Sequence, residues 1–240
     1  MTTTHPQAIV TFTAKETARL VETEKRPPIP GKGEVVARTL VSLISPGTEL
    51  HSGYFGEKFP NEPGYAAVAE VTECGEGVHE RQPGERVLVT GPGGIGGHRR
   101  YQRFPVNAAV PLPEGISPEA AVHARLVNVT FSALSTTSIR PPGGVLITGL
   151  GPVGHLGAQL FRAAGYDVMG VDPDTGRLAF ADDKGIPCLP GAPRDNALFK
   201  ERTRLALECS GIESALLDCC HCVRRHGEVV LTGVPWKPRS

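Results

Sequence analysis

A short apolar strand that runs directly into a glycine-rich turn and a helix constrains this chain more than any other sequence feature. Residues 145–148 are apolar or β-branched, and the sequence Gly-Leu-Gly-Pro-Val-Gly follows at 149–154. In such a turn the first glycine allows a sharp reversal, the second lets the backbone approach a pyrophosphate, and the third lets helix and strand pack closely. Amides at the helix start then face the phosphates. The predicted dinucleotide-binding residues are Gly149, Leu150, Gly151, Pro152, Val153 and Gly154.

An acidic residue follows the next predicted strand at the expected distance. Residues 167–171 read as a strand, and Asp172 comes 18 residues after Gly154 (172 − 154). A spacing of about 20 residues is typical of the acid that binds the adenosine ribose. Because a carboxylate accepts ribose hydroxyls and repels a 2′-phosphate, we expect the cofactor NAD rather than NADP. The alternative is a bare glycine turn in which Asp172 only caps the next helix.

The two halves of the chain have different patterns. Residues 1–120 hold short β-branched runs punctuated by Gly and Pro, with strands expected at 35–41, 65–71 and 86–90. Residues 121–240 alternate strands and helices, which predicts a parallel sheet with right-handed crossovers. A helix should begin at the Ser117-Pro118-Glu119 start signal and continue to residue 134. The other expected elements are strands at 145–148, 167–171, 186–189, 204–209 and 227–232, and helices at 153–164, 176–184 and 212–224.

Composition excludes several classes of partner. Lys plus Arg and Asp plus Glu each total 25, so bulk charge favours neither nucleic acid nor a membrane surface. The short basic runs at 98–100 and 224–226 are interpreted as solvated faces. No stretch is apolar enough to span a bilayer, and the amino terminus lacks the features of a signal peptide. We therefore expect a cytoplasmic protein with reduced cysteines.

Several motifs resemble the medium-chain dehydrogenase/reductase superfamily, the relatives of zinc-type alcohol dehydrogenases, over nearly the whole chain. The motifs lie at 45–49 (Ser-Pro-Gly-Thr-Glu), 63–65, 83–87, 208–211 and 227–233, besides the glycine fingerprint. The resemblance implies an α/β protein in which a GroES-like, mostly β catalytic domain (1–120) precedes a Rossmann domain (121–240). The Rossmann domain would be a doubly wound parallel sheet that lacks its last strand, because family members usually continue further. We expect self-association through the open sheet edge near 227–232.

The chain departs from the family at the zinc ligands. The resemblance places a Cys where this chain has Pro46, a His where it has Tyr65, and a third ligand near Val127. Pro and Val cannot bind a metal, and a neutral Tyr is a poor ligand, so we expect no catalytic zinc. The cluster Cys219-Cys220-His221-Cys222 lacks two further ligands at suitable spacing, and we expect it to pack on the sheet instead.

Without zinc, a side chain must manage the proton or oxyanion of a hydride transfer. The resemblance assigns a proton-relay hydroxyl to Thr48 and a relay histidine to His51, and it points Tyr65 toward the site. The alternatives are a turn residue at Thr48, a surface histidine at His51 and an aromatic plug at Tyr65. Asn128 lies beside the missing third ligand. By the same resemblance, the further cofactor-binding residues are Thr130, Arg177, Cys209 and Gly233.

The expected function is therefore zinc-independent, NAD(H)-dependent hydride transfer on a small alcohol or ketone. Two alternatives stay open: a reductase of activated double bonds of the enoyl or quinone type, and a nucleotide-binding partner or regulator without catalysis. The second glycine run, at 91–97, also follows a strand. No helical pattern comes after it, so we interpret it as a flexible loop.

Overall fold

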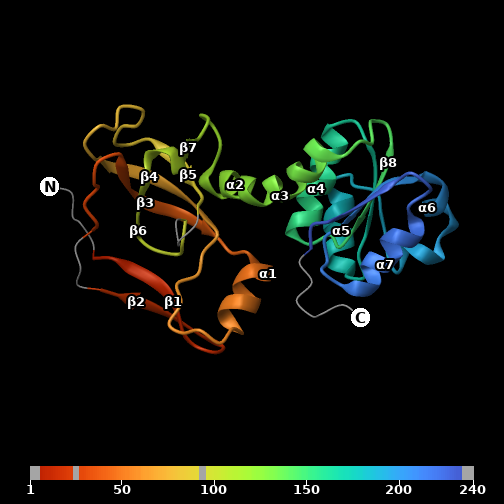
Figure 1. Cartoon of the computed structure of the whole chain (residues 1–240), viewed down its shortest axis with the longest axis horizontal. Helices are drawn as coiled ribbons and strands as arrows, with labels where there is room; N and C mark the ends of the chain where they lie inside the picture. Colours follow the sequence, from red (N-terminus) through yellow and green to blue (C-terminus); the bar gives the residue numbers. More distant parts are fainter. Residues whose placement is uncertain (1–5, 24–26, 92–95, 234–240) are drawn as a thin grey trace. The chain divides into compact units, whose positions relative to one another are not determined.

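The computed structural model describes residues 6–23, 27–91 and 96–233 and divides into two compact units, Met1–Arg125 and Leu126–Ser240 (Figure 1). The division falls inside helix α3 (Ala124–Thr136), five residues after the expected boundary at 120. Residues 92–95 of the second glycine run lie outside the described residues, and so does the flexible loop expected there.

The first unit is built on an antiparallel sheet with the strand order β6-β3-β4-β5-β7 and carries a separate two-stranded ribbon, β1–β2. Alternating small and β-branched residues of the central strands form its core, with Val35, Ala37, Ala69, Val87 and Phe104 all nearly inaccessible. The strands are β1 (Ala8–Ala14), β2 (Thr17–Glu22), β3 (Glu34–Leu43), β4 (Ala66–Cys74), β5 (Arg86–Val89), β6 (Tyr101–Pro105) and β7 (Ala109–Pro111).

Three of these strands, β3, β4 and β5, confirm the strands expected at 35–41, 65–71 and 86–90. The ribbon strand β2 was not expected because most of its residues are exposed, so no buried face patterns its sequence. A short helix α1 (Pro46–Thr48) continues into a π-helical turn at Glu49–Tyr54. This helical segment follows the carboxyl end of β3 and contains Thr48 and His51.

The second unit contains a parallel sheet with the order β10-β9-β8-β11-β12, as the alternating pattern predicts. The chain enters at the central strand β8, moves outward to β10 and then crosses back to β11 beside β8. This reversal creates a topological switch point between β8 and β11. The strands are β8 (Gly144–Thr148), β9 (Asp167–Val171), β10 (Cys188–Leu189), β11 (Thr203–Glu208) and β12 (Glu228–Leu231).

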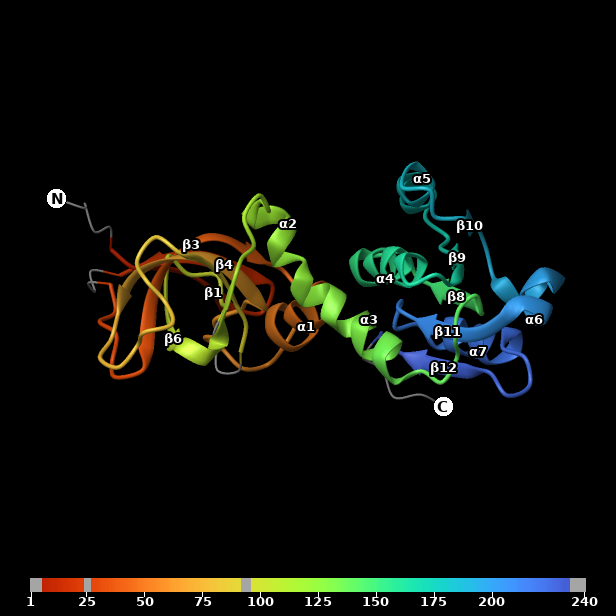
Figure 2. The ribbon, with the colours of Figure 1, turned by 90° about the horizontal axis from the view of Figure 1, so that it is seen from above.

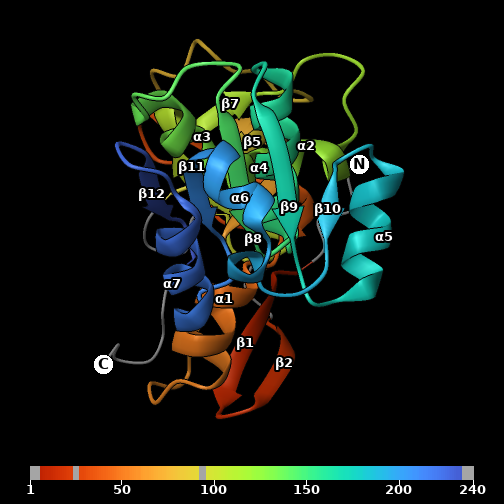
Figure 3. The ribbon, with the colours of Figure 1, turned by 90° about the vertical axis from the view of Figure 1, so that its right-hand side faces the viewer.

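Helices cover both faces of this sheet (Figures 2 and 3). One core joins the sheet to Ala133 of α3, Phe161 of α4 and Ala181 of α5, and the other joins it to Phe199 of α6 and Cys219 of α7. The sheet is therefore doubly wound. The helices are α4 (Pro152–Ala163), α5 (Thr175–Asp183), α6 (Ala197–Arg202) and α7 (Glu213–Cys222).

Two sequence expectations about helices were wrong in detail. The helix expected to run to residue 134 is broken at His123, so that α2 (Pro118–Val122) precedes α3. The break was missed because residues 119–134 contain no Gly or Pro to mark it. Helix α6 was also missed, because its six residues are too few to display a helical period.

Candidate functional site

The glycine turn after β8 is shaped by close backbone contacts. Gly149 has φ +86°, and a Cβ on it would lie 2.9 Å from the backbone nitrogen of Ser210. A Cβ on Gly154 would lie 1.9 Å from the carbonyl oxygen of Gly149. Both positions therefore require glycine, one because of its backbone conformation and one because helix α4 packs directly on the turn.

The amino terminus of α4 is open above this turn. Gly151 is the N-cap in an extended conformation, and a Cβ placed on it would meet no atom within 4 Å. The helical ladder begins with the bond from the His155 amide to the Gly151 carbonyl at 2.8 Å, so the amides of Val153 and Gly154 precede it. A free space bounded by helix-start amides fits a pyrophosphate.

Asp172 lies directly after β9 and reaches back to the glycine turn. Its side chain is only 1% exposed, and its Oδ2 accepts the Leu150 amide at 2.7 Å and Arg177 Nη1 at 3.3 Å. Its Oδ1 accepts the amide of Asp174 at 2.9 Å, which leaves acceptor capacity on that oxygen. Helix α5 is capped by Asp174 instead, whose side chain accepts the Arg177 amide, so the capping alternative for Asp172 is wrong.

The end of β11 forms the other side of the switch point. Glu208 is fully buried, and its Oε1 accepts the amides of Ser210 and Gly211 at 2.7 and 2.9 Å. Cys209 lies beside Gly154, and Gly233 donates its amide to the Glu208 carbonyl at 2.8 Å. The predicted residues Cys209 and Gly233 thus gather at the carboxyl edge of the sheet with the glycine turn. Sequence reasoning missed Ser210 and the organising carboxylate of Glu208.

The Cys209 thiol is not a nucleophile in this setting. Burial raises its pKa to about 12, and Thr232 Oγ1 donates a hydrogen bond to its sulfur at 2.9 Å. The Cys209 side chain is therefore suited to packing rather than to reaction as a thiolate.

Helix α3 carries two predicted residues in different surroundings. Thr130 is fully buried, its hydroxyl donates to the Val127 carbonyl at 3.1 Å, and its methyl group packs where Gly157 of α4 leaves room. Asn128 is exposed, and its backbone carbonyl accepts Ser132 Oγ at 3.0 Å. Thr130 joins α3 to α4 in this structure, whereas the Asn128 side chain is accessible to a ligand.

In the first unit, Thr48 and His51 are exposed on the helical segment after β3. The Ser45 hydroxyl lies 3.4 Å from Thr48 Oγ1. Glu49, the next residue, is 8% exposed, and its Oε1 accepts the Ser45 amide at 2.7 Å. The turn that presents Thr48 is therefore fixed from within by a buried carboxylate.

His98 pairs with that carboxylate. Its Nε2 lies 2.9 Å from Glu49 Oε2 and its Nδ1 lies 2.7 Å from Ser42 Oγ, while its side chain is 10% exposed. The prediction that residues 98–100 form a solvated face was wrong, because each member pairs with an acidic side chain; the partners of Arg99 and Arg100 are Glu62 and Glu22. Residues 224–226 are exposed, as expected.

Tyr65, at the entrance to β4, stacks against a cation. The guanidinium carbon of Arg125 lies 4.3 Å from the centroid of its ring. Both side chains are partly exposed, and the guanidinium makes a cation–π contact with the Tyr65 ring. Nothing in the sequence indicates that Arg125 pairs with Tyr65, because residues 60 positions apart leave no local signal.

The residues at the family's zinc positions do not fit a metal ion. Pro46 and Val127 offer no side-chain donor, and Tyr65 faces a guanidinium. Within the described ranges, no three His, Cys, Asp or Glu side chains are grouped so as to hold a metal. Cys219 and Cys222 are fully buried in the sheet core with raised pKa values, which confirms that they pack as apolar residues.

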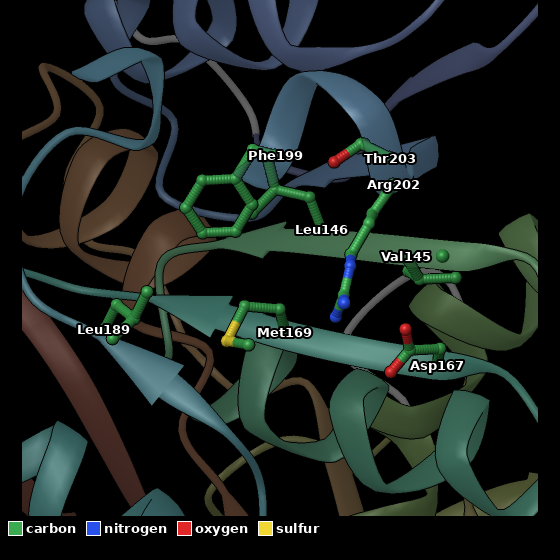
Figure 4. Close-up of a pocket in the computed structure, with 9 residues that line it drawn as sticks. Val145, Leu146, Asp167, Met169, Leu189, Phe199, Arg202 and Thr203 are labelled. Carbon is green, nitrogen blue, oxygen red and sulfur yellow. The ribbon is translucent and has the colours of Figure 1, made fainter. Parts of the chain in front are cut away.

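A cavity of about 60 Å³ lies elsewhere on the second unit, beneath α6 (Figure 4). Leu146, Met169 and Phe199 line it, and Arg202 extends into it beside Asp167. Its lining includes Gly144 and Asp167, the first residues of β8 and β9. Open parallel sheets bind nucleotides at the carboxyl ends of their strands, so this cavity is separate from the glycine turn.

Comparisons with known proteins agree with this geometry. Residues 152–240 match the family model of zinc-binding dehydrogenases. An alcohol dehydrogenase of Geobacillus stearothermophilus is 26% identical over an alignment that covers 95% of this chain and 78% of the relative. No helix in the described part of the chain is long and apolar enough to cross a membrane.

Two solved structures show the same fold. Acetophenone reductase from Geotrichum candidum, in complex with NAD, matches with a TM-score of 0.83 and 20% identity, covering 96% of this chain and 76% of that one. A protein of Sinorhizobium meliloti 1021 described as a zinc-binding dehydrogenase, bound to NADP, matches with a TM-score of 0.80 and 20% identity, covering 98% of this chain and 79% of that one. These likenesses confirm the expected fold.

Proposed function

We propose that the chain, which is similar to zinc-binding dehydrogenases over residues 152–240 and to an alcohol dehydrogenase over most of its length, is a medium-chain dehydrogenase/reductase that transfers hydride between NAD(H) and a small alcohol or ketone without a metal ion. The observation that carries the proposal is the glycine turn. Gly154 packs on the Gly149 carbonyl, and the space above Gly151 is open at the start of α4. That arrangement leaves helix-start amides directed at a space that suits a pyrophosphate.

The chain's own groups have distinct tasks in this proposal. The amides of Val153 and Gly154 would hold the pyrophosphate, and the turn at 208–211 forms the other side of the switch point. A nicotinamide dinucleotide, when bound, supplies or accepts the hydride. Thr130, Cys209 and Gly233 are kept as proposed cofactor contacts on the family resemblance.

The preference for NAD rests on the charge of Asp172. Its carboxylate is buried beside the turn, and Oδ1 can still accept a ribose hydroxyl. Arg177 is about half exposed and pairs with Oδ2, so it partly offsets the negative charge. The NAD complex of the Geotrichum reductase and the NADP complex of the Sinorhizobium dehydrogenase indicate that this fold accepts either cofactor, so residues such as Asp172 and Arg177 must decide.

Zinc independence follows from the residues at the family's metal positions, which do not fit a metal. In place of a zinc ion, we assign proton transfer to Thr48 and His51, both on the exposed helical segment after β3. The Tyr65 hydroxyl would polarise a substrate carbonyl while Arg125 fixes its ring. Asn128 is exposed and can donate a further hydrogen bond.

The test begins with cofactor binding. Titration with NADH and NADPH, followed by fluorescence, should give saturable binding with tighter NADH; a folded protein that binds neither contradicts the proposal. Turnover of NADH is then assayed with ketones, aldehydes, enones and quinones in metal-chelated buffer. Turnover confined to enones or quinones selects the double-bond reductase, and binding without turnover selects the regulatory alternative.

We also propose self-association through the edge strand β12. In the described residues β12 pairs only with β11, and Leu231 is 48% exposed on it. An edge of this kind offers unpaired backbone groups to a second copy. Light scattering over a range of concentrations should give a dimer mass; a monomer mass at high concentration contradicts it.

A further inference from the structure

The side chain of His98 joins two polar groups in the interior of the first unit. An ionised carboxylate only accepts hydrogen bonds, so Nε2–H donates to Glu49 Oε2 at 2.9 Å and Nδ1 accepts the Ser42 hydroxyl at 2.7 Å. Both ring nitrogens of His98 are therefore engaged by polar partners. With 10% and 8% of their side chains exposed, His98 and Glu49 form a nearly desolvated pair.

One side of this pair leads to Thr48. The Glu49 carboxylate that receives His98 through Oε2 receives the Ser45 amide through Oε1 at 2.7 Å. The Glu49 amide donates to the Ser45 carbonyl at 2.8 Å, and the Ser45 hydroxyl lies 3.4 Å from Thr48 Oγ1. The turn that presents Thr48 is thus closed by a carboxylate whose orientation depends on His98.

The other side leads to Tyr65. The His98 amide donates to the Pro63 carbonyl at 3.1 Å. Gly64, with φ +135°, packs so closely that a Cβ on it would lie 2.2 Å from the Gly97 Cα. The Gly97 carbonyl accepts a hydrogen bond from the side-chain Nε2 of the buried Gln102 at 2.7 Å. The peptide immediately before Tyr65 therefore rests on the segment that carries His98.

We propose that His98 is a positioning residue of the metal-free site, which sets the relative placement of the Thr48 hydroxyl and the Tyr65 ring. The inference rests on the proposed function, in which those two groups handle the proton and the substrate carbonyl. Where a metal ion is present, it holds the groups of the site in place. Here we assign that role to the hydrogen bonds that join Ser42, His98 and Glu49. His98 itself touches neither substrate nor cofactor.

The first arm of the test does not require turnover. The hydrogen exchange of the Ser45 amide is measured by NMR in the wild type, His98→Gln, His98→Phe and Ser42→Ala. The matched control is His123→Gln, because His123 is exposed and its Nδ1 lies 2.7 Å from the carbonyl oxygen of Glu119 in α2. We expect Ser45 protection to fall at least ~10-fold in His98→Phe, less in His98→Gln and Ser42→Ala, and not at all in the control.

The same spectra report on the second arm of the bridge. The Tyr65 and Thr48 amide resonances should shift together in the His98 variants and remain in place in the control. Unchanged Ser45 protection and unchanged resonances in folded His98→Phe and Ser42→Ala overturn the proposal. If His98→Phe does not fold, the milder Ser42→Ala, which removes a single hydrogen bond, decides alone.

Kinetic measurements distinguish a positioning role of His98 in catalysis from a role in stability alone. With a substrate found in the panel above, we expect kcat to fall at least ~10-fold in His98→Phe, with partial recovery in His98→Gln, while KM and NADH affinity change less than ~3-fold. A parallel loss of NADH affinity, or equal kcat in all variants, overturns the proposal. A wild type without turnover refutes the proposed function only, and the exchange arm then still decides the role of His98.

Discussion

The Asp172 carboxylate accepts a hydrogen bond from the Leu150 amide at 2.7 Å, which ties the end of β9 to the glycine turn that follows β8. The sequence suggests a ribose ligand at Asp172, and the structure adds that the same carboxylate holds the turn in place. A ribose-binding role for Asp172 predicts that its substitution affects NADH and NADPH binding differently, whereas a role in holding the turn predicts the same effect on both.

Asp172→Asn should weaken NADH binding about 10-fold while leaving NADPH binding equal or tighter, because the amide no longer repels a 2′-phosphate. Fluorescence titrations with both cofactors measure this ratio. Asp183→Asn is the matched control, since Asp183 is exposed and pairs with the neighbouring Lys184. An equal loss for NADH and NADPH would mean that Asp172 serves only to hold the turn.

Gly154→Ala and Gly151→Ala should fail in different ways. A Cβ at 154 would lie 1.9 Å from the Gly149 carbonyl oxygen, and we expect a loss of about 3 kcal/mol in the free energy of unfolding. A Cβ at 151 meets nothing within 4 Å, so that variant should keep its stability to within about 1 kcal/mol but lose NADH affinity. Denaturant unfolding and NADH titration separate the two effects. Unchanged NADH affinity in Gly151→Ala would show that the pyrophosphate does not bind above Gly151.

Tyr65→Phe should lower kcat about 10²-fold with little change in stability. The phenyl ring keeps the stack on Arg125, whereas the hydroxyl that would polarise the carbonyl is gone. Tyr54→Phe is the control, because Tyr54 packs by its ring against Phe12 and Phe55. Steady-state kinetics and thermal unfolding are compared for the three proteins. Wild-type kcat in Tyr65→Phe would reduce Tyr65 to a space-filling aromatic.

His155 should make the fold sensitive to mild acid. Burial, and then the charge of Lys184, hold the pKa of His155 below its ordinary value of 6.5. The unfolded chain therefore takes up this proton more readily, so stability is full above pH 6.5 and falls as the pH drops toward the lower pKa of the folded state. Its Nδ1 has no hydrogen-bond partner in the described structure, and its ring lies 4.6 Å from Phe180.

His155→Phe removes the titrating group and keeps the ring contact. Between about pH 7.5 and 5.5 its Tm should fall by ~2–4 °C less than that of the wild type. His221→Phe, at an exposed position on α7, serves as the control and should follow the wild type. Calorimetry at the two pH values measures the difference. Identical acid sensitivity in all three proteins would show that folding does not lower the pKa of His155.

Local patterns predicted much of the second unit. The fingerprint at 149–154 and the strand before Asp172 were found because a Rossmann turn needs its glycines and its acid at fixed spacing. β8, β9, β11 and β12 agree with the expected segments to within one or two residues. The short α6 and the exposed β2 were not predicted, because neither has a buried face whose hydrophobic residues repeat with a recognisable period.

What the sequence determined by itself is the dinucleotide half of the protein, because those residues are neighbours along the chain and their spacing carries the chemistry. The tertiary structure alone decided the surroundings of the proposed catalytic groups. His98 reaches Ser42 across 56 positions and Glu49 across 49, and Arg125 lies over a ring 60 positions away. Such contacts exist only because the antiparallel sheet returns distant segments to one place, and no local pattern encodes that return.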